Sequence, residues 1–227
     1  MIVAKRKPFG EIKNNLKDYR RILVVGCGTC VAVCLAGGKK EVSLLAAQLR
    51  MNFGLEKKDV HIAEETLERQ CDREFLDTLN DRIKDFDIVL SLACGAGVQL
   101  LAETYPEKSV IPGVNTTFIG VAEAAGLWTE RCQACGDCLL SLTGGICPRT
   151  RCTKGLSNGP CGGMRDGQCE IDPDRSCAWV LIYDQLDRAG RLDQIEPLLP
   201  PTDFRYQTKP GKVSHPAYLR RYHGGSK

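Results

Sequence analysis

Eight cysteines between residues 131 and 177 are the first residues in this sequence whose type and spacing suggest chemistry. The first three form a C-x2-C-x2-C run, in which each two-residue gap reverses the chain and turns backbone N–H groups toward the sulfurs. The fourth is followed by proline, a feature of some cysteine runs that bind iron–sulfur clusters. The pattern therefore favours an iron–sulfur site. The eight are Cys132, Cys135, Cys138, Cys147, Cys152, Cys161, Cys169 and Cys177.

These cysteines can be divided between two sites, although their spacing does not fix the division. If the cysteine before proline serves the other cluster, as in two-cluster ferredoxins, the first three need a distant partner such as Cys177. A second site would then use Cys147, Cys152, Cys161 and Cys169. Structural zinc usually takes two C-x2-C pairs, and no later pair follows the first run. The first site is thus better suited to iron–sulfur, whereas the irregular second set is compatible with zinc or iron–sulfur.

Five further cysteines lie in the first half of the chain. The segment GCGTCVAVC holds Cys27, Cys30 and Cys34, while Cys71 follows the second apolar run and Cys94 ends the third. A single cysteine at a strand end is commonly a small buried hydrophobe, and C-x2-C can be a redox pair. Together, however, the five predict a cluster site, for which four ligands suffice. Cys71 is the weakest candidate of the five.

Strands and helices must alternate over residues 1–125 to position this second set. Apolar residues at helical spacing separate the apolar runs, which is typical of βαβ units with right-handed crossovers. We therefore expect an α/β fold with a small doubly wound parallel sheet of about four strands. The carboxyl ends of its strands share one edge, where Cys27 and Cys94 should converge and helix N-termini would favour anionic thiolates. The expected strands are 21–28, 59–65, 87–95 and 109–115, and the expected helices lie near 42–49, 75–83 and 96–105.

Residues 126–190 form a different kind of segment, rich in cysteine and glycine and poor in periodic apolar residues. Such a segment cannot bury much apolar surface, so we expect a module organised by its metal ligands. The run AWVLIYDQL at 178–186 predicts a helix that packs this module onto the sheet. Residues 191–227 are predicted to form an extended tail, whose basic end at 205–227 is either solvated or a docking segment for a partner.

The cysteine count, the net charge and the length of the apolar runs exclude several other classes of protein. Thirteen cysteines is an odd number, and disulfides are rare in reducing compartments, so metal binding is favoured. A net charge of +3 is too small to indicate nucleic acid binding. No apolar run approaches the ~20 residues of a membrane span, and the first residues lack the features of a signal peptide. We therefore expect a cytoplasmic protein without a membrane span.

Features of acid–base catalysis and nucleotide binding are scarce. Residues 26–31 read GCGTCV, which lacks the third glycine of a dinucleotide-binding loop, and the sequence contains no P-loop. None of the three histidines, His61, His215 and His223, is close in sequence to a plausible nucleophile. The sequence therefore indicates an electron carrier that leaves bond chemistry to a partner.

Several segments resemble one known family. RCQACGDCLLSLTGGICPRTRC, KGLSNGPCGG and CAWVLIYDQL are similar to the C-terminal domain of methylenetetrahydrofolate reductases from acetogenic and related anaerobic bacteria. GCGTCVAVC and LSLACGAGVQ resemble other parts of the small subunit of that enzyme. The TGGICP and NGPCGG segments are specific, and the likeness covers the larger part of the chain.

This resemblance implies an electron-transfer subunit with at least two, at most three, 4Fe–4S clusters. Its partner would be a larger subunit that contains FMN or FAD and reduces methylene-tetrahydrofolate to methyl-tetrahydrofolate in the Wood–Ljungdahl pathway. Ferredoxin or another low-potential donor would supply the electrons. The same family domain has been regarded as zinc-binding, so zinc at one C-terminal site remains an alternative, as does a purely structural subunit held together by zinc.

Overall fold

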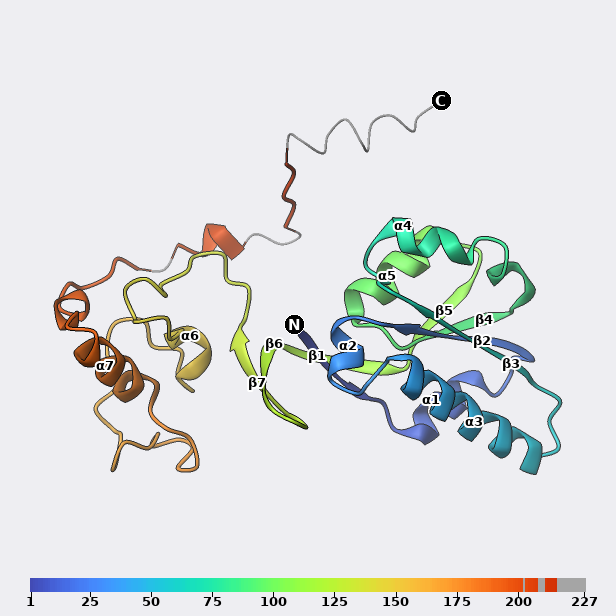
Figure 1. Cartoon of the computed structure of the whole chain (residues 1–227), viewed down its shortest axis with the longest axis horizontal. Coiled ribbons are helices and arrows are strands. Elements are labelled where there is room, and N and C mark those ends of the chain that lie inside the picture. The colour runs from blue at the N-terminus through green and yellow to red at the C-terminus, as the bar shows by residue number, and fades with distance from the viewer. Residues whose placement is uncertain (202, 208–210, 216–227) are drawn as a thin grey trace. The chain divides into compact units, whose positions relative to one another are not determined.

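The computed structural model describes residues 1–201, 203–207 and 211–215. The chain forms two compact units, Met1–Arg131 and Cys132–Lys227, which we call the sheet unit and the cysteine unit (Figure 1). The predicted basic tail extends beyond the described residues, and His223 also lies outside them.

The sheet unit is built around a parallel sheet of four strands, which confirms the predicted α/β architecture. The strands are β2 (Arg21–Cys27), β3 (His61–Leu67), β4 (Ile88–Ser91) and β5 (Ser109–Pro112), in the order β3-β2-β4-β5. Every neighbouring pair is parallel, and the register pairs Cys27 with Leu67 and Val25 with Ser91. The carboxyl ends of β2, β3 and β4 therefore lie along the same edge.

Helices cover both faces of this sheet because alternate residues of β2 point in opposite directions. Ile22 and Val24 face a cluster that includes the buried residues of α3 (Lys39–Leu55) and α1 (Phe9–Leu16). Leu23 and Val25 face the other cluster, which includes Leu76 of α4 (Arg73–Leu76) and Leu101 of α5 (Gly95–Thr104). In Figure 1, α1 and α3 accordingly lie on one side of the strands, and α4 and α5 on the other.

The second predicted helix, over 75–83, is broken into three short pieces. These are α4, η1 (Asp77–Leu79) and η2 (Ile83–Asp85), although Leu76, Leu79 and Ile83 are buried as the helical spacing suggested. The hydroxyl of Tyr105 donates to the Leu76 carbonyl over 2.6 Å. The Asn80 N–H bonds Asp77 instead of continuing the α-helical pattern to Leu76.

A second sheet was not predicted. It contains β1 (Ile2–Arg6), β6 (Val114–Ala124) and β7 (Leu127–Cys132) in the order β1-β6-β7, with β1 and β6 antiparallel. Most residues of β6 and β7 are exposed or half-buried, so these strands lack the apolar run that marks a buried strand. The predicted fourth strand ended at residue 115, whereas the chain continues there directly into β6.

The cysteine unit has a small apolar cluster of its own. Trp179, Ile182 and Leu186 of α7 (Ala178–Arg188) are buried, and Ile146, Cys177, Leu192 and Ile195 pack against them. The predicted helix therefore exists, and its apolar side packs against residues of the cysteine unit itself. The other elements are α6 (Pro148–Arg151), η3 (Leu192–Ile195) and η4 (Phe204–Gln207).

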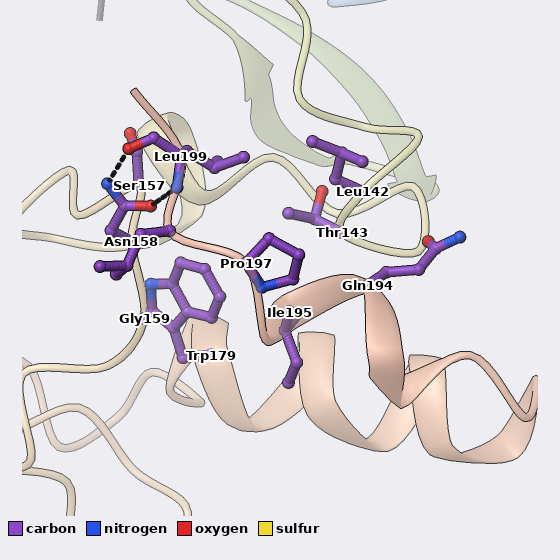
Figure 2. A pocket seen from close by; sticks show the side chains of 11 residues that line it. Leu142, Thr143, Ser157, Asn158, Gly159, Trp179, Gln194, Ile195, Pro197 and Leu199 are labelled. Atoms are coloured by element: carbon purple, nitrogen blue, oxygen red, sulfur yellow. Dashed lines mark hydrogen bonds between the residues drawn. The ribbon is translucent and has the colours of Figure 1, made fainter. Parts of the chain in front are cut away.

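Part of the predicted tail is attached to this cluster. Asn158 donates to the Leu199 carbonyl over 3.0 Å and accepts from the Leu199 N–H over 2.8 Å, as a paired strand would. Figure 2 shows this pair beside Trp179 and Pro197, which line a pocket together with Thr143. The segment around residues 197–199 is therefore fixed to the cysteine unit by both polar and apolar contacts.

Candidate metal centres

Four cysteines of the sheet unit lie at the carboxyl edge of the parallel sheet. Cys27 is the last residue of β2, and Cys30 is the first residue of α2 (Cys30–Val33). Cys71 follows β3, and Cys94 immediately precedes the first turn of α5. We call these four the sheet-edge set. The N-terminus of α5 favours negative charge at Cys94, because the helix dipole points its positive end there.

The thiols of the sheet-edge set are close enough to interact electrostatically. Burial raises the pKa of Cys71, and the negative charges that Cys94, Cys27 and Cys30 carry as thiolates raise it further. The strand topology therefore brings Cys27 and Cys94 to one region, as the edge rule predicts. Four adjacent thiolates repel one another, so a bound cation would stabilise their charged form.

Gln70 holds the loop that carries Cys71, and nothing in the sequence pattern indicated this role. Its side chain is fully buried. Its amide nitrogen donates to the Val25 carbonyl over 3.0 Å, and its carbonyl oxygen accepts from the Ser91 hydroxyl over 2.7 Å. A Cβ on Gly97 would lie 2.9 Å from the Cβ of Gln70. The glutamine thus connects the ends of β2 and β4 and fits tightly against the start of α5.

Cys34 differs from the sheet-edge set in the groups that contact its sulfur. Its side chain is buried in the apolar cluster, where Sγ accepts from the Ala4 N–H over 3.4 Å. The thiol also lies 3.6 Å from the carbonyl oxygens of Ala4 and Val31, to which it can donate. These contacts occupy the sulfur with backbone groups. Cys71, the weakest candidate from sequence, instead lies within electrostatic reach of Cys27, Cys30 and Cys94.

A pocket in the cysteine unit gathers a second group of four thiols. Its lining includes Cys152, Cys161, Cys169 and Cys177, which we call the pocket set, and it encloses about 350 Å³ of empty space, part of it open to solvent. Two backbone hydrogen bonds bring the last two together. The Cys169 N–H donates to Arg175, and the Cys177 N–H donates to Gly167, each over 2.8 Å.

Polar groups around the pocket set are directed at its sulfurs. The Gly163 N–H donates to Cys161 Sγ over 3.4 Å. The Cys161 thiol in turn donates to the Glu170 carboxylate over 3.3 Å, a contact that favours the protonated thiol, and Glu170 pairs with Lys154. The Thr153 hydroxyl lies 3.5 Å from Cys169 Sγ. That hydroxyl and two nearby backbone N–H groups lower the pKa of Cys169. Hydrogen bonds of this kind favour the thiolate, which is the form that binds a metal.

The remaining four cysteines, Cys132, Cys135, Cys138 and Cys147, form what we call the loop set. The Ala134 N–H donates to Cys132 Sγ over 3.3 Å. Arg149 donates to Cys135 Sγ over 3.0 Å. Burial acts to raise the pKa of Cys135, but the Asp137 N–H and Arg149 together lower it below its ordinary value.

This arrangement differs from the division that the spacing suggested. Cys177 lies in the pocket with Cys152, Cys161 and Cys169 rather than with the first three cysteines. Cys147 precedes α6, and that helix also carries Arg149, whose guanidinium contacts Cys135. The short helix therefore returns the chain toward the C-x2-C-x2-C loop.

The cysteines are gathered but do not adopt the geometry of metal ligands. Among the described residues, no group of three or more His, Cys, Asp or Glu side chains is arranged to hold a metal ion. None of the thirteen cysteines forms a disulfide. Within the same part of the chain, none of the helices has the length and apolar character that crossing a membrane requires.

Comparison with known proteins relates the second half of the chain to one enzyme. Residues 111–205 match the family model described as "Methylene-tetrahydrofolate reductase C terminal". Neither the curated proteins nor the solved structures gave a match. The matched segment contains the loop set and the pocket set, whereas the sheet-edge set lies before it. This similarity supports a relationship to a methylene-tetrahydrofolate reductase complex.

Proposed function

We propose that this protein is the electron-transfer subunit of a methylene-tetrahydrofolate reductase. It relays electrons through 4Fe–4S clusters to the flavin of a larger partner subunit, which reduces methylene-tetrahydrofolate to methyl-tetrahydrofolate. Ferredoxin or another low-potential donor supplies the electrons, and the complex works in the cytoplasm. The observation that carries the proposal is the family match, because it contains eight cysteines that fall into two sets of four.

Each cysteine set has the ligands that one cluster needs. A 4Fe–4S cluster takes four cysteine thiolates and supplies one-electron transfer, and its potential depends on hydrogen bonds to sulfur and on burial. The loop set has donors at Cys132 and Cys135, and the pocket set has donors at Cys161 and Cys169. In the sheet-edge set, three thiols lie within electrostatic reach of Cys71, and Cys94 precedes a helix N-terminus. We assign one cluster to each C-terminal set and a third to the sheet edge.

His61 lies away from the cysteines of the sheet-edge set, so it is not placed to act as an acid–base catalyst beside them. His61 begins β3 and stacks on Phe86, with 5.8 Å between the ring centroids. It is therefore at the amino edge of the parallel sheet, opposite the edge that carries Cys27 and Cys94.

A zinc-bound structural subunit is the second candidate, and the pocket set is the observation that favours it. Its four cysteines line a single pocket, and four cysteine thiolates are a common ligand set of structural zinc. The buried apolar cluster beside them contains only Trp179, Ile182 and Leu186. Zinc in the pocket set would stabilise this small unit without contributing to electron transfer.

Electron delivery to the flavin separates these functions. We would reconstitute the subunit with its flavoprotein partner without oxygen and follow flavin reduction by reduced ferredoxin. Cys135→Ser should abolish rapid reduction, because it removes a ligand of the loop set. Cys34→Ser is the matched control and should leave the rate unchanged, since Cys34 bonds backbone groups instead. Full activity of Cys135→Ser and of Cys161→Ser would exclude a relay through the cysteine unit and favour the structural role.

A further inference from the structure

Arg149 places a buried positive charge against the loop set. Only 7% of its side chain is exposed. One guanidinium nitrogen, Nη1, donates to Cys135 Sγ over 3.0 Å and to the Asp137 carbonyl over 2.8 Å. The other terminal nitrogen, Nη2, lies 3.1 Å from the Asp137 carboxylate. The planar guanidinium thus holds both a sulfur and the backbone two residues beyond it.

The local sequence explains why the guanidinium reaches this loop. Cys147 occupies the N-cap of α6, and Pro148 takes the first helical position, where its missing N–H costs nothing. On the other side, Ala134 and Gly136 both have positive φ, at 54° and 81°, so the chain turns sharply on either side of Cys135. One short helix, with Cys147 at its N-cap, therefore brings Arg149 to a tightly turned cysteine loop.

The positive charge of Arg149 would complement a metal site in the loop set. A buried guanidinium is stable only when it is paired and hydrogen-bonded. The Cys135 sulfur and the Asp137 carboxylate both contact it. Four thiolates around one divalent zinc ion, or around a 4Fe–4S cluster with two positive charges, leave a net negative charge of about two at the site. A guanidinium hydrogen-bonded to one of the sulfurs offsets part of this charge.

We propose that Arg149 is a positioning residue of a metal site formed by Cys132, Cys135, Cys138 and Cys147. It fixes Cys135 Sγ toward the site and offsets the negative charge of the metal–thiolate centre. The inference rests on the proposed function only in requiring that the loop set binds a metal, and it applies to zinc and to iron–sulfur alike.

The test uses the full chain, purified without oxygen, with Arg149→Gln, Arg149→Lys and Cys135→Ser. Arg188→Gln is the matched control, because Arg188 is an exposed arginine at the end of α7 in the same unit. The metal of the loop set is identified as the fraction that Cys135→Ser lacks. Its release to excess chelator is then timed in each variant. If that metal is iron, its reduction potential is measured as well.

We expect Arg149→Gln to release this metal about 10- to 100-fold faster than the unaltered chain, the usual effect of losing a group that orients a ligand. Lysine restores the positive charge but not the paired hydrogen bonds of the two terminal guanidinium nitrogens. Arg149→Lys should therefore release the metal at a rate between those of Arg149→Gln and the unaltered chain. Arg188→Gln should match the unaltered chain. Where iron is bound, Arg149→Gln should lower the reduction potential and Arg149→Lys should largely restore it, which a purely structural role would not produce.

Two results would overturn the inference, and they can be told apart. If the unaltered chain and Cys135→Ser contain the same metal, the loop set binds none, and the proposed function fails at this site together with the role of Arg149. If the unaltered chain holds the metal but Arg149→Gln and Arg149→Lys both release it at the unaltered rate, only the role of Arg149 is wrong. Should Arg149→Gln fail to fold, release from Arg149→Lys at the unaltered rate has the same meaning.

Discussion

Cys34 and Cys71 differ in what surrounds their sulfurs. The Cys34 sulfur is enclosed by the apolar cluster and bonded to the backbone of Ala4, whereas the Cys71 thiol lies near three other thiols. The C-x2-C-x3-C spacing could not reveal this difference, because α2 is only four residues long and ends just before Cys34. Whether a cysteine belongs to the sheet-edge set therefore depends on where the fold places it, and not on its distance along the chain from the other cysteines.

This difference gives a prediction at the residue scale. Cys71→Ser and Cys94→Ser should each lose the metal bound at the sheet edge, because each removes one of four ligands. Cys34→Ser should retain the full metal content. Metal analysis of the three anaerobically purified variants makes the comparison. Loss of metal from Cys34→Ser alone would mean that the assignment of ligands is wrong.

Gln70 is the polar side chain on which the geometry of the sheet edge depends most. Replacing it with leucine removes one of two hydrogen bonds to the Val25 carbonyl, which also accepts from the Leu92 N–H, and leaves the Ser91 hydroxyl without its acceptor. We expect Gln70→Leu to reduce the free energy of unfolding by about 1–3 kcal/mol, the usual cost of a buried polar group left unsatisfied. Urea unfolding of the chain measures this. Gln99→Leu is the control, because Gln99 bonds only its own helix turn at an exposed position. Equal stability of the two variants would contradict the role of Gln70.

At the scale of elements, the sequence predicts what depends on apolar pattern and misses what depends on tertiary contacts. The strands β2, β4 and β5 were predictable because they are short apolar runs separated by turns or helical patterns. The weaker strand expected at 59–65 corresponds to β3, which contains two glutamates. The break in the helix over 75–83 was not predictable, because the burial of Leu76, Leu79 and Ile83 keeps the helical spacing even where the α-helix stops. The strands β6 and β7 were not predicted, because these half-exposed strands show only weak alternation of apolar and polar residues.

The same distinction applies to the candidate sites. The convergence of Cys27 and Cys94 followed from the rule that parallel strands end at one edge. The pocket set could not be found in this way, because its cysteines lie in loops without regular spacing. What joins them is a pair of backbone hydrogen bonds, from Cys169 to Arg175 and from Cys177 to Gly167. Hydrogen bonds between loops of this kind do not produce a periodic pattern in the sequence, so they cannot be predicted from it.

At the scale of the whole molecule, the two units differ in how they gain stability. The sheet unit has apolar clusters on both faces of its sheet, whereas the cluster of the cysteine unit has three buried side chains. We propose that a small unit with so little buried apolar surface depends on its metal ligands for stability. Bound metal is therefore expected to stabilise the second half of the chain much more than the first.

Metal removal tests this dependence. After anaerobic treatment with a chelator, amide hydrogens of residues 132–190 should exchange rapidly, while those of β2, β3 and β4 should stay protected. Hydrogen exchange followed by mass spectrometry resolves the two regions in one experiment. If the amides of α7 remain as protected as those of β2 after the metal is gone, the apolar cluster of the cysteine unit is sufficient and its metal is not structural.

The metal content of the chain is the most direct test of its proposed role as an electron carrier. We would purify it without oxygen and measure iron, acid-labile sulfide and zinc per chain. A relay with two clusters or three predicts about eight to twelve iron atoms with matching sulfide, at four of each per cluster, and little zinc. About four iron and one zinc would leave one cluster and a structural zinc site. Zinc without iron would contradict the electron-transfer role.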